Sequence, residues 1–132
     1  MNLLLDTRIA IWALNDDNEL SPKARKLILD PDNIIYYSAA SVWEVMLKHS
    51  KRQDKIPFNE HDFASACNEA GYNLLNIIEK HILTVHTLST PKIEHNDPFD
   101  RILLAQAKSE NFSFMTHNEL ITGYDEKFII EV

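Results

Sequence analysis

The sequence lacks several features, and each absence removes a class of protein. Its 132 residues hold one cysteine, Cys67, so no disulfide can form within the chain, which fits a reducing cytoplasm. It has two glycines, and neither a glycine-rich phosphate loop nor the serine turn of α/β-hydrolases occurs. No stretch approaches the ~20 apolar residues that a membrane-spanning helix needs, and Asp6 and Arg8 interrupt the apolar N-terminus. We therefore expect a cytoplasmic protein with no membrane partner.

Positive charge is also scarce. Lysine and arginine number 13 against 20 aspartates and glutamates, which gives a formal net charge of −7. Proteins that coat nucleic acid present a basic face, because phosphate contacts supply most of their affinity. An enzyme that holds nucleic acid through divalent metal ions can be acidic, because the metal supplies positive charge locally. The charge therefore disfavours the first class and leaves the second open.

Strand-like and helix-like segments alternate along the chain. β-branched or aromatic runs predict short strands, and apolar residues at helical spacing predict helices between them. The alternation predicts a single α/β domain over residues 1–132 with a mostly parallel sheet, whose carboxyl edge is where such folds bind ligands. The expected strands are 2–5, 33–38, 72–77, 112–115 and 128–132. The expected helices are 7–14, 21–29, 41–49, 58–70, 79–88, 97–110 and 119–124, with Ser21, Ser41 and Asp97 as N-caps.

Three acidic residues fall near that carboxyl edge. Asp6 follows the first strand, Glu44 lies in the apolar run SVWEVMLK, and Asp100 lies in the first turn of the helix capped by Asp97. Each also has a purely structural interpretation. Asp6 can cap the next helix, Asp100 can interact with the helix dipole, and Lys48 can pair with Glu44 one turn away. Glu44 is the hardest to explain structurally, because its neighbours are apolar and a buried, unpaired carboxylate is costly.

Crowding of these acids at one edge would predict a metal site. Mutual repulsion raises the pKa of at least one carboxyl group, and a divalent cation removes that penalty. Oxygen ligands favour Mg²⁺ or Mn²⁺ over zinc, and the six histidines are scattered without the spacing of zinc ligands. Such a site is suited to phosphodiester hydrolysis by a metal-activated water.

The motifs resemble those of the VapC toxins, which are PIN-domain endoribonucleases of toxin–antitoxin pairs. The resemblance spans the whole chain and implies a PIN-like three-layer α/β/α fold with a mostly parallel central sheet. It also implies metal-dependent cleavage of RNA, a cognate antitoxin that neutralises the toxin, and a homodimer. The matching segments, in order, are LLLDTRIAIWAL, SVWEVMLK, HNDPFDRILLAQA and MTHNELITGY.

The resemblance carries roles to individual positions. The catalytic and metal-binding acids of the family fall on Asp6, Glu44 and Asp100, with Mg²⁺ or Mn²⁺ as cofactor. The auxiliary positions are Thr7, Asp97, Thr116 and Asn118.

Two positions depart from the family pattern. Arg8 stands where many relatives have histidine, which we expect to be tolerated. Asn118 stands where the family usually has aspartate, and asparagine offers a carbonyl oxygen without charge, so a second metal, if one is used, should bind more weakly. His117 and Asp125 are candidates to compensate. Asn118 also favours the competing hypothesis, a degenerate PIN domain that binds antitoxin or RNA without cleaving it.

Basic and aromatic side chains give weaker indications of RNA binding. Trp12 and Trp43 can stack on bases, but their apolar neighbours favour the core for both. A basic cluster that follows Glu44 can hold RNA phosphates, and a solvated helix end explains it equally well. Its members are Lys48, Lys51, Arg52 and Lys55.

Overall fold

A parallel five-stranded sheet forms the centre of the molecule. The computed structural model describes residues 1–51 and 56–132. The strand order is β3-β2-β1-β4-β5, and every neighbouring pair is parallel, which confirms the predicted sheet. The chain first builds outward from β1 through β2 to β3 and then returns to place β4 on the other side of β1. The strands are β1 (Asn2–Leu5), β2 (Ile34–Ser38), β3 (Asn73–Leu75), β4 (Ser113–Thr116) and β5 (Ile129–Glu131).

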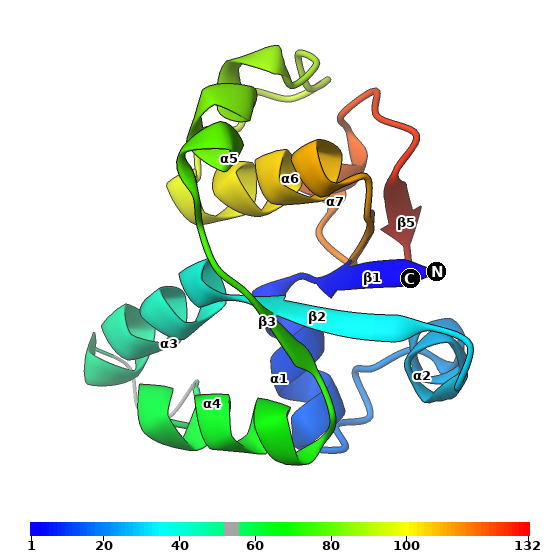
Figure 1. Cartoon of the computed structure of the whole chain (residues 1–132), viewed down its shortest axis with the longest axis vertical. Helices are drawn as coiled ribbons and strands as arrows, with labels where there is room; N and C mark the ends of the chain where they lie inside the picture. Colours follow the sequence, from blue (N-terminus) through cyan, green and yellow to red (C-terminus); the bar gives the residue numbers. More distant parts are fainter. Residues whose placement is uncertain (52–55) are drawn as a thin grey trace.

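Helices cover both faces of this sheet. Figure 1 shows α5, α6 and α7 on one face and α1, α3 and α4 on the other, so the predicted three-layer α/β/α arrangement is confirmed. Across residues 1–51 and 56–132, no helix is long and apolar enough to cross a membrane. The helices are α1 (Thr7–Leu14), α2 (Pro22–Leu29), α3 (Ala39–Lys51), α4 (Glu60–Glu69), α5 (Glu79–Thr84) with the 3₁₀ turn η1 (Val85–Thr87), α6 (Pro98–Glu110) and α7 (Glu119–Thr122).

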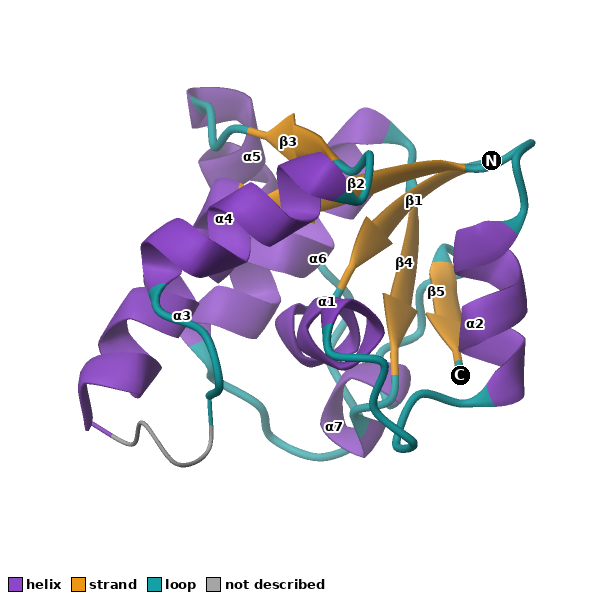
Figure 2. Cartoon of the chain, turned by 90° about the horizontal axis from the view of Figure 1, so that it is seen from below, coloured by secondary structure: helices purple, strands orange, loops and turns teal. Residues whose placement is uncertain are grey.

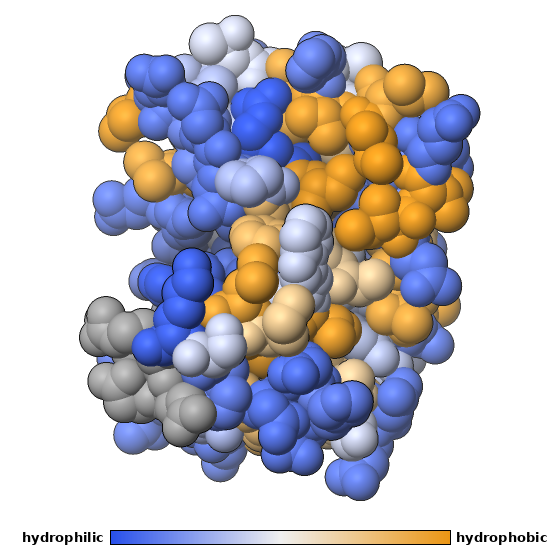
Figure 3. All heavy atoms as spheres, turned by 90° about the vertical axis from the view of Figure 1, so that its left-hand side faces the viewer, coloured by the Kyte–Doolittle hydropathy of each residue, from blue (hydrophilic) through white to orange (hydrophobic). Residues whose placement is uncertain are grey.

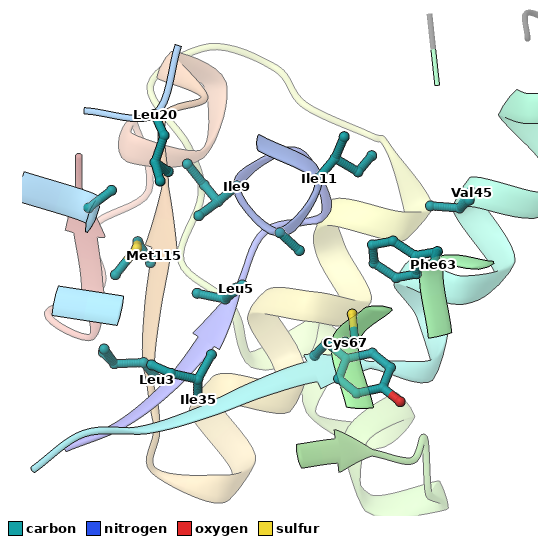
Figure 4. Packing of buried hydrophobic residues seen from close by; sticks show 13 residues of the cluster. Leu3, Leu5, Ile9, Ile11, Leu20, Ile35, Val45, Phe63, Cys67 and Met115 are labelled. Atoms are coloured by element: carbon teal, nitrogen blue, oxygen red, sulfur yellow. The ribbon is translucent and has the colours of Figure 1, made fainter. Parts of the chain in front are cut away.

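The first strand contributes to a separate hydrophobic cluster on each face. Successive strand residues point to opposite faces, and a sheet covered on both sides buries all of them. Leu3 and Leu5 pack with Ile9 of α1 and Phe63 of α4, as Figure 4 shows. Leu4 belongs to the second cluster, with side chains of α6 and α7. This double burial holds the end of β1, and therefore Asp6, in a fixed position.

The third helix begins earlier than predicted. It starts at Ala39, directly after β2, and runs to Lys51, so the expected cap at Ser41 is wrong. Ser38 takes the capping position, because its Oγ accepts a 3.0 Å hydrogen bond from the Ala40 N–H. Ser41 lies inside the helix, where its hydroxyl shares a 2.7 Å hydrogen bond with that of Thr7.

The two tryptophans have different environments. Trp12 is half-buried and packs against the hydrophobic cluster that contains Leu3 without belonging to it, so its predicted place in the core is only partly confirmed. Trp43 is 55% exposed, so its expected place in the core is wrong. It projects from the outer side of α3 and packs edge-on against Phe99, with ring centroids 5.1 Å apart.

Candidate active site

The ends of β1 and β4 hold the first acid. The Asp6 N–H donates to the Met115 carbonyl across the two strands at 3.0 Å. The Thr116 hydroxyl donates to Asp6 Oδ2 at 2.7 Å. In Figure 2 the arrowheads of β1 and β4 lie on the same side of the sheet, next to α1 and α7. The Asp6 side chain makes no capping hydrogen bond to α1, so capping does not explain its presence.

Glu44 comes from the second turn of α3 and is 5% exposed. One carboxylate oxygen, Oε2, pairs with the ammonium group of Lys48. The other, Oε1, is buried and has no hydrogen-bond partner within the described part of the chain. The pairing with Lys48 proposed from the sequence therefore exists, but it satisfies only half of the carboxylate. A buried polar oxygen without a partner normally indicates a missing ligand or water.

Asp100 comes from the first turn of α6. Pro98 occupies the first helical position, and Asp97 Oδ1 accepts a 3.0 Å hydrogen bond from the Asp100 N–H, so the predicted cap is confirmed. The Asp100 carboxylate is mostly buried, and its Oδ2 lies 2.9 Å from His95 Nε2 and 3.4 Å from Asn118 Nδ2. The side chain is thus held by partners from a loop and from the segment after β4.

The three acids line one cavity of about 760 Å³. Thr7 also lines it, although its hydroxyl is engaged by Ser41. Thr116 is fully buried behind Asp6, where it acts through its hydrogen bond. The remaining lining side chains are Arg8, Ile11, Trp12, Val45, Lys48, Lys51, Ile56, His95, Asp97, His117, Asn118 and Leu120.

Burial and mutual repulsion make two of these carboxyl groups weak acids. Burial raises the pKa of Asp6 from 3.8 to about 6, the hydrogen bond from Thr116 opposes this rise, and the charge of Glu44 adds to it. Burial also raises the pKa of Asp100 from 3.8 to about 8, with further increases from the charges of Asp6, Asp97 and Glu44. The charge of Glu44 therefore contributes to the raised pKa of both Asp6 and Asp100, and the charge of Asp6 contributes to that of Asp100.

The donor set fits a divalent cation. Among the described residues, no three acidic, histidine or cysteine side chains are arranged as a ready-made metal cage. Mg²⁺ does not require one, because it keeps several waters and binds through one or two carboxylates together with substrate phosphates. The unpartnered Glu44 Oε1 and the raised pKa values of Asp6 and Asp100 are the features that a bound cation would relieve.

Asn118 does not use its amide as the sequence suggested. Its carbonyl Oδ1 accepts a 3.0 Å hydrogen bond from the Leu120 N–H and caps α7, and its Nδ2 is the group that faces Asp100. Asp125 is exposed and lies outside the cavity lining, so its suggested compensating role is wrong. His117 does line the cavity, but its Nδ1 lies 2.6 Å from the carbonyl oxygen of Val132.

The predicted basic cluster is only partly described. Lys48 and Lys51 line the cavity, whereas Arg52 and Lys55 lie outside the described residues. Arg8 is a further basic residue of the lining, and its guanidinium lies 6.0 Å from the centroid of the Trp12 ring.

Sequence reasoning missed His95. This residue is buried in the loop before α6 and contacts both Asp100 and Tyr124. Its signals in the sequence are its position two residues before the Asp97 cap and its place at the start of the HNDPFDRILLAQA segment. That spacing places it near the first turn of α6 but does not reveal which atom it contacts.

Comparison with known proteins identifies the architecture. The PIN domain model matches residues 3–128, and no curated protein matches the chain in sequence. The structure of VapBC2 from Rickettsia felis bound to a DNA fragment from its promoter is similar, with a TM-score of 0.70 and 17% identity over 100% of this chain and 99% of that chain. A toxin–antitoxin complex from Klebsiella pneumoniae has a TM-score of 0.59 and 21% identity, over 98% and 99% of the two chains. VapBC-1 from nontypeable Haemophilus influenzae has a TM-score of 0.56 and 20% identity, over 89% and 87%.

Proposed function

Because the chain belongs to the PIN domain family, we propose that it is a metal-dependent endoribonuclease and the toxin of a toxin–antitoxin pair. The observation that carries the proposal is the convergence of Asp6, Glu44 and Asp100 on one cavity, with Glu44 Oε1 buried and unpartnered within the described residues. The three acids come from separate parts of the chain, because Asp6 follows β1, Glu44 lies in α3 and Asp100 lies in α6.

Asp6, Glu44 and Asp100 are the residues that would hold Mg²⁺ or Mn²⁺. Such an ion, when bound, activates a water, orients the scissile phosphate and offsets charge on the leaving oxygen. Asp6 is held by the Thr116 hydroxyl, and Asp100 is held by His95, so two of the three carboxylates are fixed before any ligand arrives. Burial excludes bulk water and strengthens the interaction of these charges with a ligand.

Basic residues at the cavity support RNA as the substrate. Lys48 and Lys51 lie on α3 one and two turns after Glu44, and both line the cavity. Lys48 is about half exposed, so its ammonium group can contact a phosphate beside the acids. We propose that Lys48 and Lys51 bind the RNA backbone, which compensates locally for the net charge of −7.

A protein partner is part of the same proposal. Three solved structures that resemble this chain are of VapBC proteins or a toxin–antitoxin complex, which supports a cognate antitoxin. We propose that the pair acts in the cytoplasm, because a single cysteine fits a reducing compartment. In Figure 3 hydrophobic side chains gather on the upper right, on the side where α5 lies, and this apolar face supports association with an antitoxin or a second copy in a homodimer. The exposed apolar residues of β3, α5 and the residue before α5 are Leu74, Ile78, Ile82 and Leu83.

A degenerate PIN domain is the second candidate. It would bind antitoxin or RNA without cutting the RNA. The use of the Asn118 carbonyl as the cap of α7 favours it, because that oxygen is then not free to hold a second metal or a water. Under this alternative the acids remain as remnants of a site.

Cleavage of a structured RNA by the antitoxin-free protein distinguishes the two candidates. We expect fragments with Mg²⁺ or Mn²⁺, none with a chelator and none from Asp6→Asn. Asp125→Asn is the matched control, because Asp125 is exposed and lies outside the cavity lining. Equal cleavage by wild type and Asp6→Asn would indicate a contaminating nuclease. A complete lack of cleavage by wild-type protein that binds Mn²⁺ would favour the degenerate domain.

A further inference from the structure

A series of three side-chain hydrogen bonds leads to Asp100 from Arg101 through Tyr124 and His95. Arg101 Nη1 lies 3.0 Å from the Tyr124 hydroxyl oxygen, that oxygen lies 3.1 Å from His95 Nδ1, and His95 Nε2 lies 2.9 Å from Asp100 Oδ2. His95 and Tyr124 are both buried, so water does not substitute for these contacts. In the proposed function His95 is only a contact of Asp100, and Arg101 and Tyr124 have no role.

The available protons determine which atom donates in each of these hydrogen bonds. Arg101 can only donate, so the Tyr124 oxygen accepts a hydrogen bond from its guanidinium group. The hydroxyl has one proton of its own, and His95 Nδ1 at 3.1 Å is a closer acceptor than the His95 carbonyl oxygen at 3.5 Å. Donation from Tyr124 to Nδ1, the shorter of the two contacts, would leave the neutral ring with its proton on Nε2, facing Asp100.

We propose that His95 is a positioning residue for Asp100, and that Arg101 and Tyr124 select the tautomer in which it works. The Nε2–H donates to Asp100 Oδ2 and fixes the rotation of the carboxylate. Within residues 1–51 and 56–132, Asp100 Oδ1 has no hydrogen-bond partner, so this oxygen remains available to a ligand in the cavity. The inference rests on the proposed function, in which Asp100 is a metal ligand.

Fixing a ligand by a second layer of hydrogen bonds has a measurable effect. Loss of such a partner typically weakens metal binding by about 10–100-fold, because the ligand must then be ordered at the moment of binding. Asp100 has one other side-chain contact at this oxygen, Asn118 Nδ2 at 3.4 Å, which is longer than the contact with His95. We therefore expect His95 to carry most of the orientation.

Isothermal titration calorimetry of the full chain with Mn²⁺ tests the proposal without any activity measurement. His95→Phe keeps a ring but loses both nitrogens, and we expect its Mn²⁺ affinity to fall by about 10–100-fold. His95→Gln keeps a donor and an acceptor at similar positions, and we expect it to retain most of the affinity. Tyr124→Phe removes the hydroxyl that selects the tautomer and should give an intermediate loss. Tyr36→Phe, which alters a half-buried tyrosine packed on Phe112, is the matched control and should bind like wild type.

The ring nitrogens of His95 provide a second, direct readout. Their ¹⁵N chemical shifts should identify a protonated Nε2 and an unprotonated Nδ1 in the wild type, with a mixture of tautomers in Tyr124→Phe. This measurement keeps the proposal testable if His95→Phe does not fold.

Other results would contradict the positioning role, the hydrogen-bond argument or the proposed function. If wild type binds Mn²⁺ and His95→Phe binds it equally well, the positioning role is wrong while the proposed metal site stands. If His95→Gln loses as much affinity as His95→Phe, the histidine acts through packing and the hydrogen-bond argument is wrong. If wild type binds no Mn²⁺ and the ring shows a protonated Nδ1, the proposed function and this inference both fail.

Discussion

The hydroxyl of Thr116 donates a 2.7 Å hydrogen bond to Asp6 Oδ2, joining the ends of two strands that are separated by more than a hundred residues in sequence. These strands, β1 and β4, are neighbours at the point where the order of the sheet reverses. Ligands of open parallel sheets bind at this point, outside the carboxyl ends of the strands. The bond therefore holds the first acid where the fold leaves a crevice.

Replacing Thr116 by valine should impair the site while preserving its shape. The buried hydrogen bond to Asp6 is lost, and a bond to a charged group is worth about 1.5–3 kcal/mol. Because this bond lowers the pKa of Asp6, its loss should raise that pKa and move the acid limb of the activity profile to higher pH. The measurement is cleavage rate against pH, with Thr116→Ser expected to restore most of the wild-type profile. An unchanged acid limb in Thr116→Val would show that the bond does not tune Asp6.

Stability without metal should fall as pH rises. The pKa values of Asp6 and Asp100 are raised from 3.8 to about 6 and about 8, so the folded protein holds more protons than the unfolded chain between about pH 4 and pH 8. The two protonated groups stabilise the fold fully when the pH is below their pKa in the unfolded chain. This stabilisation is lost as the pH rises through their pKa values in the folded protein. Melting temperatures in chelator should therefore decrease from about pH 4 to about pH 8 because of these two groups.

Added Mn²⁺ should reverse this trend, because metal binds the ionised carboxylates and stabilises the folded state by linkage. In the Asp100→Asn variant without metal, the melting temperature should decrease with rising pH only below about pH 7, where Asp6 titrates. A melting temperature that rises steadily with pH in chelator, for wild type and Asp100→Asn alike, would show that the acids are not crowded.

The sheet and the three acids could be predicted because each depends on local pattern. Asp6 directly follows a buried strand, and Asp97-Pro98 marks the start of α6, so parallel topology alone brings Asp6 and Asp100 to one edge. Glu44 stands out because a carboxylate interrupts an apolar run. None of these inferences requires knowledge of a side-chain rotamer.

The contacts that could not be predicted depend on tertiary geometry. His95 lies in an irregular loop without periodicity, so nothing in the sequence directs its ring toward Asp100. Ser38 and Ser41 are equally good caps by residue type, and only the end of β2 decides between them. Trp43 sits in an apolar run that looked buried on all sides, whereas one side of α3 faces solvent.

Replacing Glu44 by glutamine should separate function from stability. The metal-free protein should be as stable as wild type or more so, because a buried carboxylate with an unpartnered oxygen is removed and the lost pairing with Lys48 is half exposed. The rise in melting temperature on adding Mn²⁺ should disappear, together with RNA cleavage. Thermal unfolding with chelator and with Mn²⁺ measures both effects. A large loss of stability in chelator would show that Glu44 is a structural partner of Lys48 instead of a metal ligand.

Replacing Lys48 by methionine should weaken RNA binding. Lys48 is about half exposed at the cavity and keeps its aliphatic packing as methionine, but the buried Glu44 carboxylate then has no counter-charge, so the metal-free variant should also be less stable than wild type. If its ammonium contacts one RNA phosphate, the salt dependence of binding should fall by about 0.7 in the slope of log affinity against log salt concentration for single-stranded RNA. Lys127→Met is the matched control, since Lys127 is exposed and lies outside the lining of this cavity. An equal fall in slope for both variants would mean that RNA binding depends on the total charge of the protein and not on Lys48 in particular. A fall in Lys48→Met alone would place an RNA phosphate beside the acids.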